Sequence, residues 1–480
     1  MRKALELALD GPWIAPAGSG FDVVAPGTGK SLVSLKHGGA ADIRSACERA
    51  RLAQEKWFAL NFEDRARVLR VAADLMEQHI DLYMGWIVRE AGSSEGKAGF
   101  EISVVIKALR EAAAMPSQPP GLVLPSDPSK LSFCRRMPLG VVGVISPFNF
   151  PMYLSMRAVA PALAVGNAVV LKPDPRTSVS AGLLMAQLLA AAGLPEGVLQ
   201  VVPGGIDAGE ALCTDPNVAM IQFTGSTAAG RKIGALAGGH LKKLSLELGG
   251  KNSLIILEDA DLDLAAANAA WGAYLHQGQI CMASGRILVH ESIHGALAER
   301  LVAKAKALPL GDPAAGQVAL GPVINSSQVA RAMQIIEDSV AAGAILRTGG
   351  GTDGLFFEPT VLTGVTPQMR AFRDEFFAPV ASLTSFGTDE EAIALANDTE
   401  YGLSAGVISR SVGRAMAIGA RLRTGLLHIN DQTVADDVVN PFGGRGASGN
   451  GTSIGGPANW DEFSQWQWVT IKDSAPAYPF

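Results

Sequence analysis

The chain has 480 residues, enough for about three domains of ~150 residues each. Hydrophobic residues make up 48% and charged residues 18% of the sequence, which supports a large core and excludes wholesale disorder. The formal net charge of -6 gives no support for a nucleic-acid-binding surface.

The cysteine pattern and the apolar stretches limit compartment and metal chemistry. Cys47, Cys134, Cys213 and Cys281 lie far apart and form no Cys-x-x-Cys pair. This spacing argues against a zinc site and a disulfide framework, and it fits a reducing cytoplasm, so we expect a cytoplasmic protein without a metal. Near the N-terminus, Glu6 and Asp10 interrupt any apolar core of a signal peptide. The most apolar region, residues 138–171, contains Pro147, Pro151, Pro161 and Arg157, which favours buried strands and a helix over a membrane span.

The first 114 residues predict two strands and four helices. The strands are expected within residues 22–36, around a Pro26-Gly27 turn. Apolar side chains recur at helical spacing in the four helical stretches, which are residues 41–57, 63–79, 81–91 and 98–114. Prolines between positions 116 and 125 predict a loop, and residues 130–137 read as an extended segment that could be half of a protruding hairpin.

From residue 141 onward, apolar strands alternate with helices. The strands are expected at residues 141–145, 168–172, 198–202 and 219–223, with helices at 152–165, 178–192 and 207–213. This alternation predicts βαβ units in a parallel sheet, whose ligands bind beyond the carboxyl ends of the strands. Asn149, Lys172, Gly205 and Gly225 lie at or just after those ends.

Residues 225–232 look like a nucleotide-triphosphate loop, but Arg231 stands where that motif needs lysine and Lys232 where it needs Ser or Thr. A helix N-terminus that offers backbone N–H groups to a cofactor pyrophosphate is the more economical interpretation. No Gly-x-Gly-x-x-Gly fingerprint follows these strands.

A second α/β unit is predicted after residue 250. Its strands are expected at residues 253–257, 286–289 and within 401–409, and its helices at 261–275, 292–306 and 326–342. Loops are expected over residues 425–431 and 441–451. The tail at 465–471 alternates polar and apolar residues and predicts an edge strand.

Three short segments combine the groups that acyl chemistry needs. Cys281 lies between the apolar Ile280 and Met282, Glu247 lies in an apolar strand directly before a glycine pair, and Asn149 lies between aromatic residues and prolines. A thiol, a carboxylate whose pKa is raised by apolar neighbours and a side-chain amide can serve as nucleophile, base for water and oxyanion donor. Taken singly, a buried core cysteine, a strand carboxylate and a turn asparagine are the plainer interpretations.

Seven ordered segments resemble the NAD(P)-dependent aldehyde dehydrogenase family. They are residues 147–151, 170–173, 223–227, 246–251, 278–281, 375–379 and 441–444. Their order and spacing extend over essentially the whole chain, and seven together are far more specific than any one. The resemblance implies oxidation of an aldehyde to a carboxylic acid with NAD or NADP, through a thiohemiacetal and a thioester on Cys281. It also implies that the Cys281 backbone N–H is the second oxyanion donor.

The resemblance further implies which residues bind cofactor and substrate. Lys172 would hold the cofactor ribose, and Glu375 the nicotinamide ribose with Phe377 beside the ring. The full cofactor set is Ser146, Pro147, Phe148, Lys172, Gly205, Gly209, Phe223, Gly225, Ser226, Leu248, Glu375 and Phe377. Residues 149–157, 428–434, 446–451 and 455–460 are most similar to benzaldehyde, vanillin and salicylaldehyde dehydrogenases. We therefore expect an aromatic aldehyde in a pocket formed by Tyr153, Arg157, Ile280, Met282 and His428.

The implied fold is α/β. It comprises a Rossmann-like cofactor-binding domain at residues 1–118 and 138–247, a catalytic domain at 248–455, and a β oligomerisation arm at 119–137 and 456–480. The resemblance implies a homodimer or homotetramer in which the edge strand pairs with a neighbouring subunit. Apart from the small-molecule aldehyde, no nucleic-acid or membrane partner is expected.

Cofactor choice depends on the residues after Lys172. Pro175 stands where NAD-preferring relatives often carry a glutamate that holds the adenosine ribose, so we expect both cofactors to be accepted. The direction of the Asp174 side chain stays open.

Other functions also stay open. An aliphatic aldehyde or semialdehyde dehydrogenase uses the same residues, and Glu247 argues against a CoA-acylating enzyme. A cysteine–histidine hydrolase with His276 as base would leave Lys172 and Glu375 without a role. A non-catalytic binding protein on the same fold conflicts with the intact set of reactive residues.

Overall fold

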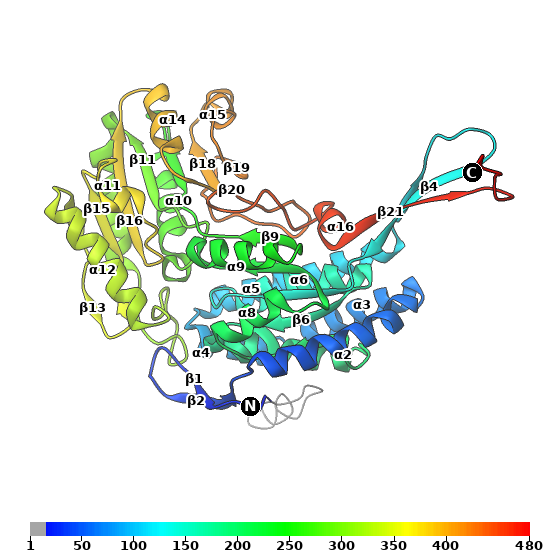
Figure 1. The fold of residues 1–480 in the computed structure, drawn as a ribbon. Coiled ribbons are helices and arrows are strands. Elements are labelled where there is room, and N and C mark those ends of the chain that lie inside the picture. Colours follow the sequence, from blue (N-terminus) through cyan, green and yellow to red (C-terminus); the bar gives the residue numbers. More distant parts are fainter. Residues whose placement is uncertain (1–15) are drawn as a thin grey trace.

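The computed structural model describes residues 16–480, so the segment with Glu6 and Asp10 lies outside the described part (Figure 1). Between residues 16 and 480, no helix combines the length and the apolar character that crossing a membrane requires.

A five-stranded parallel sheet forms one half of the body. Its strands are β5 (Val141–Ile145), β6 (Ala168–Lys172), β7 (Leu199–Val201), β8 (Val218–Thr224) and β9 (Lys243–Glu247), in the order β7-β6-β5-β8-β9. Every residue of β5 and β6 is buried, which explains their unbroken apolar sequence. The connecting helices are α6 (Pro151–Val165), α8 (Ile206–Thr214) and α9 (Thr227–Gly239). The predicted parallel βαβ arrangement is therefore confirmed.

The helix predicted at residues 178–192 begins differently. A π-helical turn, Val179–Leu183, precedes α7 (Leu184–Ala191). There the backbone N–H groups of Val179 and Ser180 donate to the buried Glu90 carboxylate, at 2.8 and 2.7 Å, so a partner from outside the helix shapes its first turn.

An N-terminal layer of helices packs against this sheet. The antiparallel strands β1 (Gly20–Val24) and β2 (Ser31–Lys36) come first. They are followed by α2 (Ala40–Ala59), α3 (Phe62–Gln78), α4 (Ile80–Ala91) and α5 (Glu95–Ala114), close to the predicted ranges. Helix α5 lies along α6 in the middle of the body (Figure 1).

A seven-stranded mixed sheet forms the other half, in the order β12-β15-β16-β11-β10-β18-β19. Its strands are β10 (Ser253–Ile256), β11 (Arg286–His290), β12 (Ile345–Thr348), β15 (Thr360–Thr363), β16 (Val380–Phe386), β18 (Ser404–Ile408) and β19 (Leu426–Ile429). The helices are α10 (Leu262–Tyr274), α11 (Glu291–Ala307), α12 (Ser326–Ala341), α14 (Asp389–Asn397) and α15 (Val412–Gly419). The loop expected over residues 425–431 was wrong, because residues 426–429 pair with β18 and form an edge strand.

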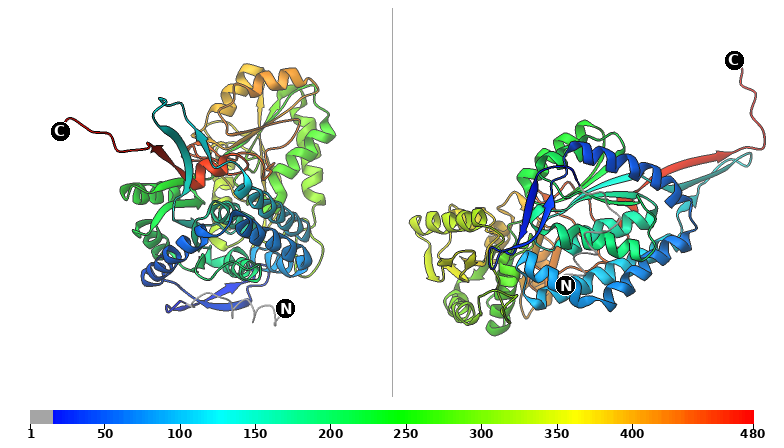
Figure 2. Two further views of the ribbon diagram at one scale, coloured as in Figure 1. Left: turned by 90° about the vertical axis from the view of Figure 1, so that its right-hand side faces the viewer. Right: turned by 90° about the horizontal axis from the view of Figure 1, so that it is seen from below.

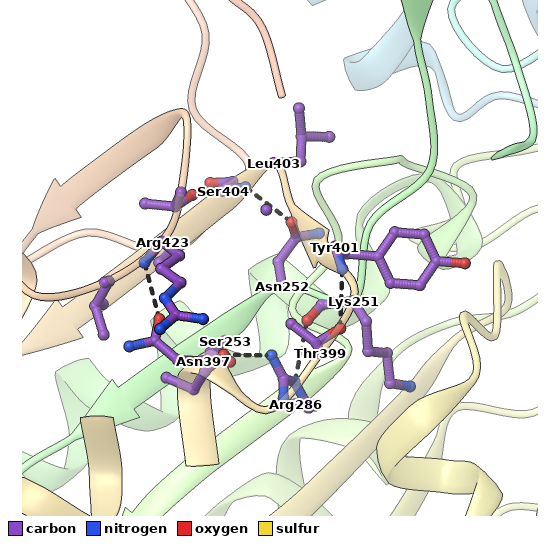
Figure 3. A pocket seen from close by; sticks show the side chains of 15 residues that line it. Lys251, Asn252, Ser253, Arg286, Asn397, Thr399, Tyr401, Leu403, Ser404 and Arg423 are labelled. Carbon is purple, nitrogen blue, oxygen red and sulfur yellow. Dashed lines mark hydrogen bonds between the residues drawn. The ribbon is translucent and has the colours of Figure 1, made fainter. Parts of the chain in front are cut away.

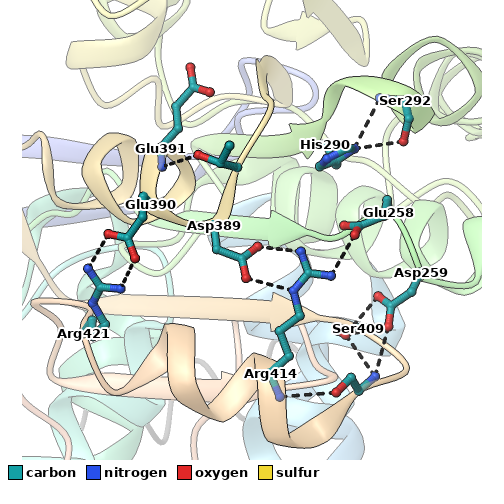
Figure 4. A network of polar contacts seen from close by, with 12 residues as sticks. Glu258, Asp259, His290, Ser292, Asp389, Glu390, Glu391, Ser409, Arg414 and Arg421 are labelled. Carbon is teal, nitrogen blue, oxygen red and sulfur yellow. Dashed lines mark hydrogen bonds and ion pairs between the residues drawn. The ribbon is translucent and has the colours of Figure 1, made fainter.

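Ion pairs link α14 and α15 at one end of this sheet (Figure 4). Arg414 contacts Asp389 at 2.6 Å and Glu258 at 2.8 Å, and Arg421 contacts Glu390 at 2.5 Å. The side chains are partly exposed to solvent, so such pairs contribute little to stability individually.

A three-stranded antiparallel arm projects from the body (Figures 1 and 2). It contains β3 (Gly121–Val123), β4 (Leu131–Pro138) and β21 (Ser464–Ile471), with β4 in the middle. The short α16 (Ala458–Phe463) leads into it. The predicted edge strand is confirmed as β21, and the expected proline-rich loop contains the additional strand β3.

Candidate active site

Cys281 follows a strained turn at the end of α10. His276 and Gln277 have φ angles of 49° and 56°, which residues other than glycine rarely adopt. The Gln277 side chain offsets this cost by donating to the carbonyl oxygens of Gly92 and Pro322, at 2.8 and 3.0 Å. The turn is therefore fixed by contacts with two distant loops.

Asn252 holds the cysteine loop from the other side. Its Nδ2 donates to the carbonyl oxygens of Cys281 and Ala283, at 2.8 and 2.9 Å, and its Oδ1 accepts from the Ser404 N–H at 2.9 Å (Figure 3). A Cβ on Gly250 would lie 2.8 Å from the Cys281 carbonyl oxygen, so the close approach requires glycine there. Sequence reasoning missed Asn252, although it lies five residues after Glu247.

Glu247 is the last residue of β9, at the carboxyl edge of the five-stranded sheet. Its side chain is 5% exposed, and within residues 16–480 neither carboxylate oxygen has a hydrogen-bond partner. Burial raises the pKa of Glu247 well above its usual range, and the positive charge of Arg157 acts in the opposite direction. The predicted elevation of this pKa is confirmed.

Asn149 joins the turn before α6 to the cysteine loop. Its side-chain Nδ2 donates to the Gln279 carbonyl oxygen at 2.8 Å, two residues before Cys281. A side-chain amide carries two N–H groups, so this bond leaves the second one for another acceptor.

Electrostatic coupling shows that the candidate nucleophile and base lie in one region. Burial, together with the charges of Glu375 and Glu247, raises the pKa of the Cys281 thiol to about 12. Arg157 lowers both the Cys281 and the Glu247 pKa. The charges of the sequence-predicted Glu247, Glu375 and Arg157 therefore all act on the Cys281 thiol.

Arg157 and Tyr153 project from one face of α6 onto Asp436. The Asp436 carboxylate accepts from the Tyr153 hydroxyl at 2.9 Å and from Arg157 Nη1 at 3.0 Å. The Arg157 guanidinium also lies 4.0 Å from the centre of the Phe442 ring. Asp436 and Phe442 come from the loop after β19, and Asp436 is a second residue that sequence reasoning missed.

The other predicted pocket residues are less tightly connected. Ile280 and Met282 are buried in the core on either side of Cys281. His428 lies on β19 of the other sheet, where burial lowers its pKa and the charge of Asp436 acts against that shift. The charge of Asp436 thus links His428 to Tyr153, Arg157 and Phe442, here called the Arg157 group.

The predicted cofactor residues line the carboxyl ends of the parallel strands. Lys172 is buried at the end of β6, where its Nζ donates to the Pro173 carbonyl oxygen at 3.3 Å. Gly205 caps α8 and Gly209 lies beside the Lys172 side chain, while the Ser146 hydroxyl accepts from Ser155 at 2.7 Å.

A second group surrounds the first turn of α9. Ser226 caps this helix by accepting from the Ala229 N–H, and the Gly225 N–H donates to the Glu247 carbonyl oxygen at 3.0 Å. The Phe223 ring lies so close to Gly225 that a Cβ there would clash at 2.5 Å, and Leu248 packs in the same way against Gly230.

Glu375 and Phe377 approach from the seven-stranded half. Glu375 Oε1 accepts from the Gly250 N–H at 3.2 Å, and burial raises the pKa of Glu375 to about 7. Phe377, with a φ of 51°, meets the Phe148 ring edge-on at 5.9 Å between centroids. These contacts bring the Pro147-Phe148 turn and residues 375–377 together.

Two other buried groups, His276 and Lys251, lie close to this set. His276 packs its ring 5.8 Å from that of Phe150, burial lowers its pKa far below the usual range, and within the described chain it has no hydrogen bond to Cys281. This geometry does not support the hydrolase alternative. Lys251 lines the pocket behind Asn252, where its Nζ lies 4.3 Å from the Phe376 ring centre and burial lowers its pKa to about 7 (Figure 3).

Comparison with known proteins identifies the family. Residues 13–469 match the aldehyde dehydrogenase family model. The chain is 49% identical over 471 residues to a vanillin dehydrogenase from Amycolatopsis sp., with 98% of this chain and 97% of that protein covered. It is 45% identical over 469 residues to a benzaldehyde dehydrogenase [NAD(+)] from Pseudomonas putida, with coverage of 98% and 96%.

The fold agrees with this assignment. A crystal structure of betaine aldehyde dehydrogenase from Staphylococcus aureus in complex with NAD+ matches with a TM-score of 0.95 and 29% identity, over 100% of this chain and 98% of that one. The chain belongs to the aldehyde dehydrogenase family, which confirms the predicted family and fold class.

Proposed function

We propose that this enzyme oxidises an aromatic aldehyde of the benzaldehyde or vanillin type to its carboxylic acid with NAD or NADP. The observation that carries the proposal is a buried carboxylate, Glu247, which has no protein partner among the described residues and whose charge reaches the Cys281 sulfur. The names of the two relatives support the aromatic substrate.

The chain's own residues supply each step except hydride acceptance. After the thiol proton passes to water, the Cys281 thiolate attacks the aldehyde carbon and forms a thiohemiacetal oxyanion, because a planar carbonyl does not release hydride readily. The free N–H of Asn149 and the Cys281 backbone N–H stabilise the oxyanion. A bound nicotinamide supplies the hydride acceptor. Glu247 then takes a proton from the water that cleaves the resulting thioester.

The residues at the strand ends fit a dinucleotide. Within residues 16–480, Lys172 makes one hydrogen bond, to Pro173, which leaves two N–H donors for a ligand. Ser226 caps a helix whose first N–H groups suit a pyrophosphate. A Cβ on Gly249 would lie 2.6 Å from Glu375 Oε2, so glycine there leaves room for the carboxylate. Glu375 would bind the nicotinamide ribose, and Phe377 would lie beside the ring.

Substrate selection would fall to the Arg157 group. Tyr153, Arg157 and Phe442 form a layered cation–aromatic cluster beside the reactive thiol. Ile280 and Met282 add apolar surface on either side of Cys281, and His428 would close the far side. A flat aromatic ring gains more from such surroundings than a short aliphatic chain.

The domain division and assembly are proposed on the same basis. The two sheets support a cofactor-binding domain at 1–118 and 138–247 and a catalytic domain at 248–455, with the arm at 119–137 and 456–480. Trp466 and Trp468 on the arm's edge strand are 49% and 68% exposed, which supports pairing with another copy in a homodimer or homotetramer. The free cysteines support a cytoplasmic location.

The test is aldehyde-dependent NAD(P)H formation by the wild type and by Cys281→Ala, with cofactor binding measured separately. We expect the variant to bind cofactor and to lose oxidation. Near wild-type oxidation by Cys281→Ala would overturn the mechanism. Best turnover of an aliphatic aldehyde or a semialdehyde would reassign the substrate alone.

A further inference from the structure

A fully buried ion pair lies behind the turn that carries Asn149. Lys97 and Glu101, one helical turn apart on α5, are in contact at 2.6 Å, and both side chains are 0% exposed. Burying two charges costs more desolvation energy than their attraction usually returns, so such a pair is not explained by stability alone. The contacts that this pair makes with other residues indicate its role.

Both members of the pair bind the same turn. Lys97 Nζ donates to the Asn149 carbonyl oxygen at 2.6 Å. The Glu101 Oε1 atom accepts from the backbone N–H groups of Met152 and Tyr153, at 2.8 and 3.1 Å. The pair thus binds the backbone at Asn149 and again at Met152 and Tyr153.

Glu101 replaces the cap that α6 lacks. This helix begins with Pro151, and its N-cap residue Phe150 makes no side-chain cap bond. The first N–H groups of a helix need an acceptor, and a carboxylate there also interacts favourably with the helix dipole. Glu101 meets both needs from another helix, so the start of α6 is fixed relative to α5.

Lys97 fixes the other side of the turn. Besides the Asn149 carbonyl, its ammonium lies 4.0 Å from the centre of the Phe150 ring, which in turn contacts His276 of the cysteine turn. The Asn149 backbone is therefore held by Lys97, and its side chain by the Gln279 carbonyl. Because the backbone and the side chain of Asn149 are both held, the second N–H group of its amide points in one direction.

We propose that Lys97 and Glu101 are positioning residues that aim the Asn149 amide at the developing oxyanion. The inference rests on the proposed function, in which Asn149 is an oxyanion donor. Donors of this kind work only when they are aimed in advance at the place where charge develops. Neither member of the pair touches the substrate in this account.

The test is a double-mutant cycle with Asn149. Lys97→Met/Glu101→Gln removes both charges together, so that neither is left buried and unpaired. The matched control is Lys107→Met/Glu111→Gln, because these residues have the same types and spacing on the same helix but Lys107 is exposed and Glu111 half-buried. The readouts are the single-turnover rate of NAD(P)H formation, the cofactor Kd and the melting temperature, each with and without Asn149→Ala.

We expect the Lys97/Glu101 variant to lose about 10- to 100-fold in single-turnover rate, the range of a donor misplaced by about 1 Å. Its cofactor Kd should stay within about twofold of wild type, and the control should match wild type in rate. In the Asn149→Ala background the same change should cost less than about threefold, because nothing remains to be aimed.

Two results would overturn the proposal: an undiminished loss in the Asn149→Ala background, or a wild-type rate in the folded Lys97/Glu101 variant. A wild-type rate for Asn149→Ala alone would instead refute the donor role in the proposed function, and the positioning role with it. If the double variant does not fold, Glu101→Asp carries the cycle, because it keeps both charges and draws the carboxylate back from the Met152 and Tyr153 N–H groups.

Discussion

Asp436 binds Arg157 through both carboxylate oxygens, with Oδ2 3.0 Å from Nη1 and Oδ1 3.4 Å from Nη2. The pair joins α6 to the loop after β19, 279 residues apart in sequence. Because the two side chains are only 8% and 12% exposed, the guanidinium cannot exchange its partner for water easily. Asp436 therefore keeps the positive charge of Arg157 near Cys281 and Glu247.

The first prediction follows from this pair. Asp436→Asn should lower the free energy of unfolding by about 3 kcal/mol, because it leaves a buried arginine without its counter-charge. It should also lower kcat/KM for benzaldehyde, because Arg157 and Tyr153 lose their common anchor. Asp437→Asn, next to it and exposed, should change stability by less than about 0.5 kcal/mol. Equal urea-denaturation midpoints for the two variants would contradict the structural role of Asp436.

The second prediction concerns the resting thiol. With the pKa of Cys281 raised to about 12 by burial, its thiolate fraction in the cofactor-free enzyme should rise about tenfold per pH unit from pH 7 to 10. The alkylation rate with iodoacetamide should rise with it. Cys281→Ala supplies the background from other cysteines. A plateau below pH 9 would show that the resting thiol is already activated.

Glu375 provides a check on the same electrostatics. Its negative charge is the first cause after burial that raises the Cys281 pKa, so removing it should favour the thiolate. Glu375→Gln should therefore alkylate faster than the wild type at a fixed pH above 8, where the wild-type carboxylate, with its pKa of about 7, is charged. An unchanged rate would place the Glu375 charge too far away to act, and a slower rate would contradict its raising of the thiol pKa.

The third prediction separates the two halves of the reaction. Glu247→Gln should spare formation of the thioester more than its hydrolysis, because the buried carboxylate is placed to activate water. Rapid mixing should show a burst of NAD(P)H followed by turnover slowed about 100-fold or more. Glu210→Gln, an exposed carboxyl on α8, should behave as wild type. An equal fall in burst and steady-state rates would exclude a specific deacylation role.

The fourth prediction concerns substrate choice. Benzaldehyde-type substrates should exceed short aliphatic aldehydes in kcat/KM. A ring buried against Ile280, Met282 and the Arg157 group gains about 25 cal/mol of hydrophobic free energy per Å² of apolar surface. A panel of aromatic and aliphatic aldehydes with both cofactors measures this. Acetaldehyde or succinate semialdehyde as the best substrate would reject the aromatic assignment.

Local sequence patterns predicted most helices, the parallel strands and the reactive residues. Features that depend on contacts between residues distant in sequence were visible only in the structure. Apolar periodicity located the helices and the parallel strands, and short motifs singled out Cys281, Glu247 and Asn149. Asp436 could not be recognised, because an acidic residue in a loop looks the same whether it faces solvent or anchors a distant arginine. β19 was read as a loop because a half-buried edge strand of four residues has little periodicity.

The Lys97–Glu101 pair is a second feature that local sequence patterns do not reveal. A lysine followed four residues later by a glutamate is ordinarily an exposed helix pair. The neighbouring Lys107 and Glu111 have this sequence pattern and lie at least partly in solvent. Only the packing of α5 against α6 distinguishes the two pairs, and that packing is not encoded in their spacing.

The structure shows the direction of the Asp174 side chain, on which we base a prediction for NAD and NADP. Asp174 Oδ1 accepts from Arg176 Nε at 2.8 Å, and its Oδ2 lies 2.6 Å from Nη2. The guanidinium also lies 4.3 Å from the centre of the Phe148 ring. The carboxylate is thus neutralised, so it neither repels a 2′-phosphate strongly nor stands free to bind the ribose hydroxyls that NAD offers at the same place.

We therefore predict that both cofactors are accepted, with kcat/KM values within about a thousandfold, a span that corresponds to about 4 kcal/mol. Arg176→Ala should weaken NADP use more than NAD use, because it removes a cation and frees the Asp174 carboxylate to repel phosphate. Asp174→Ala should do the reverse, because it releases Arg176 to bind the 2′-phosphate. Steady-state kinetics with both cofactors measure the two shifts. If both variants moved the NADP/NAD ratio in the same direction, the Asp174–Arg176 pair would not be the element that sets it.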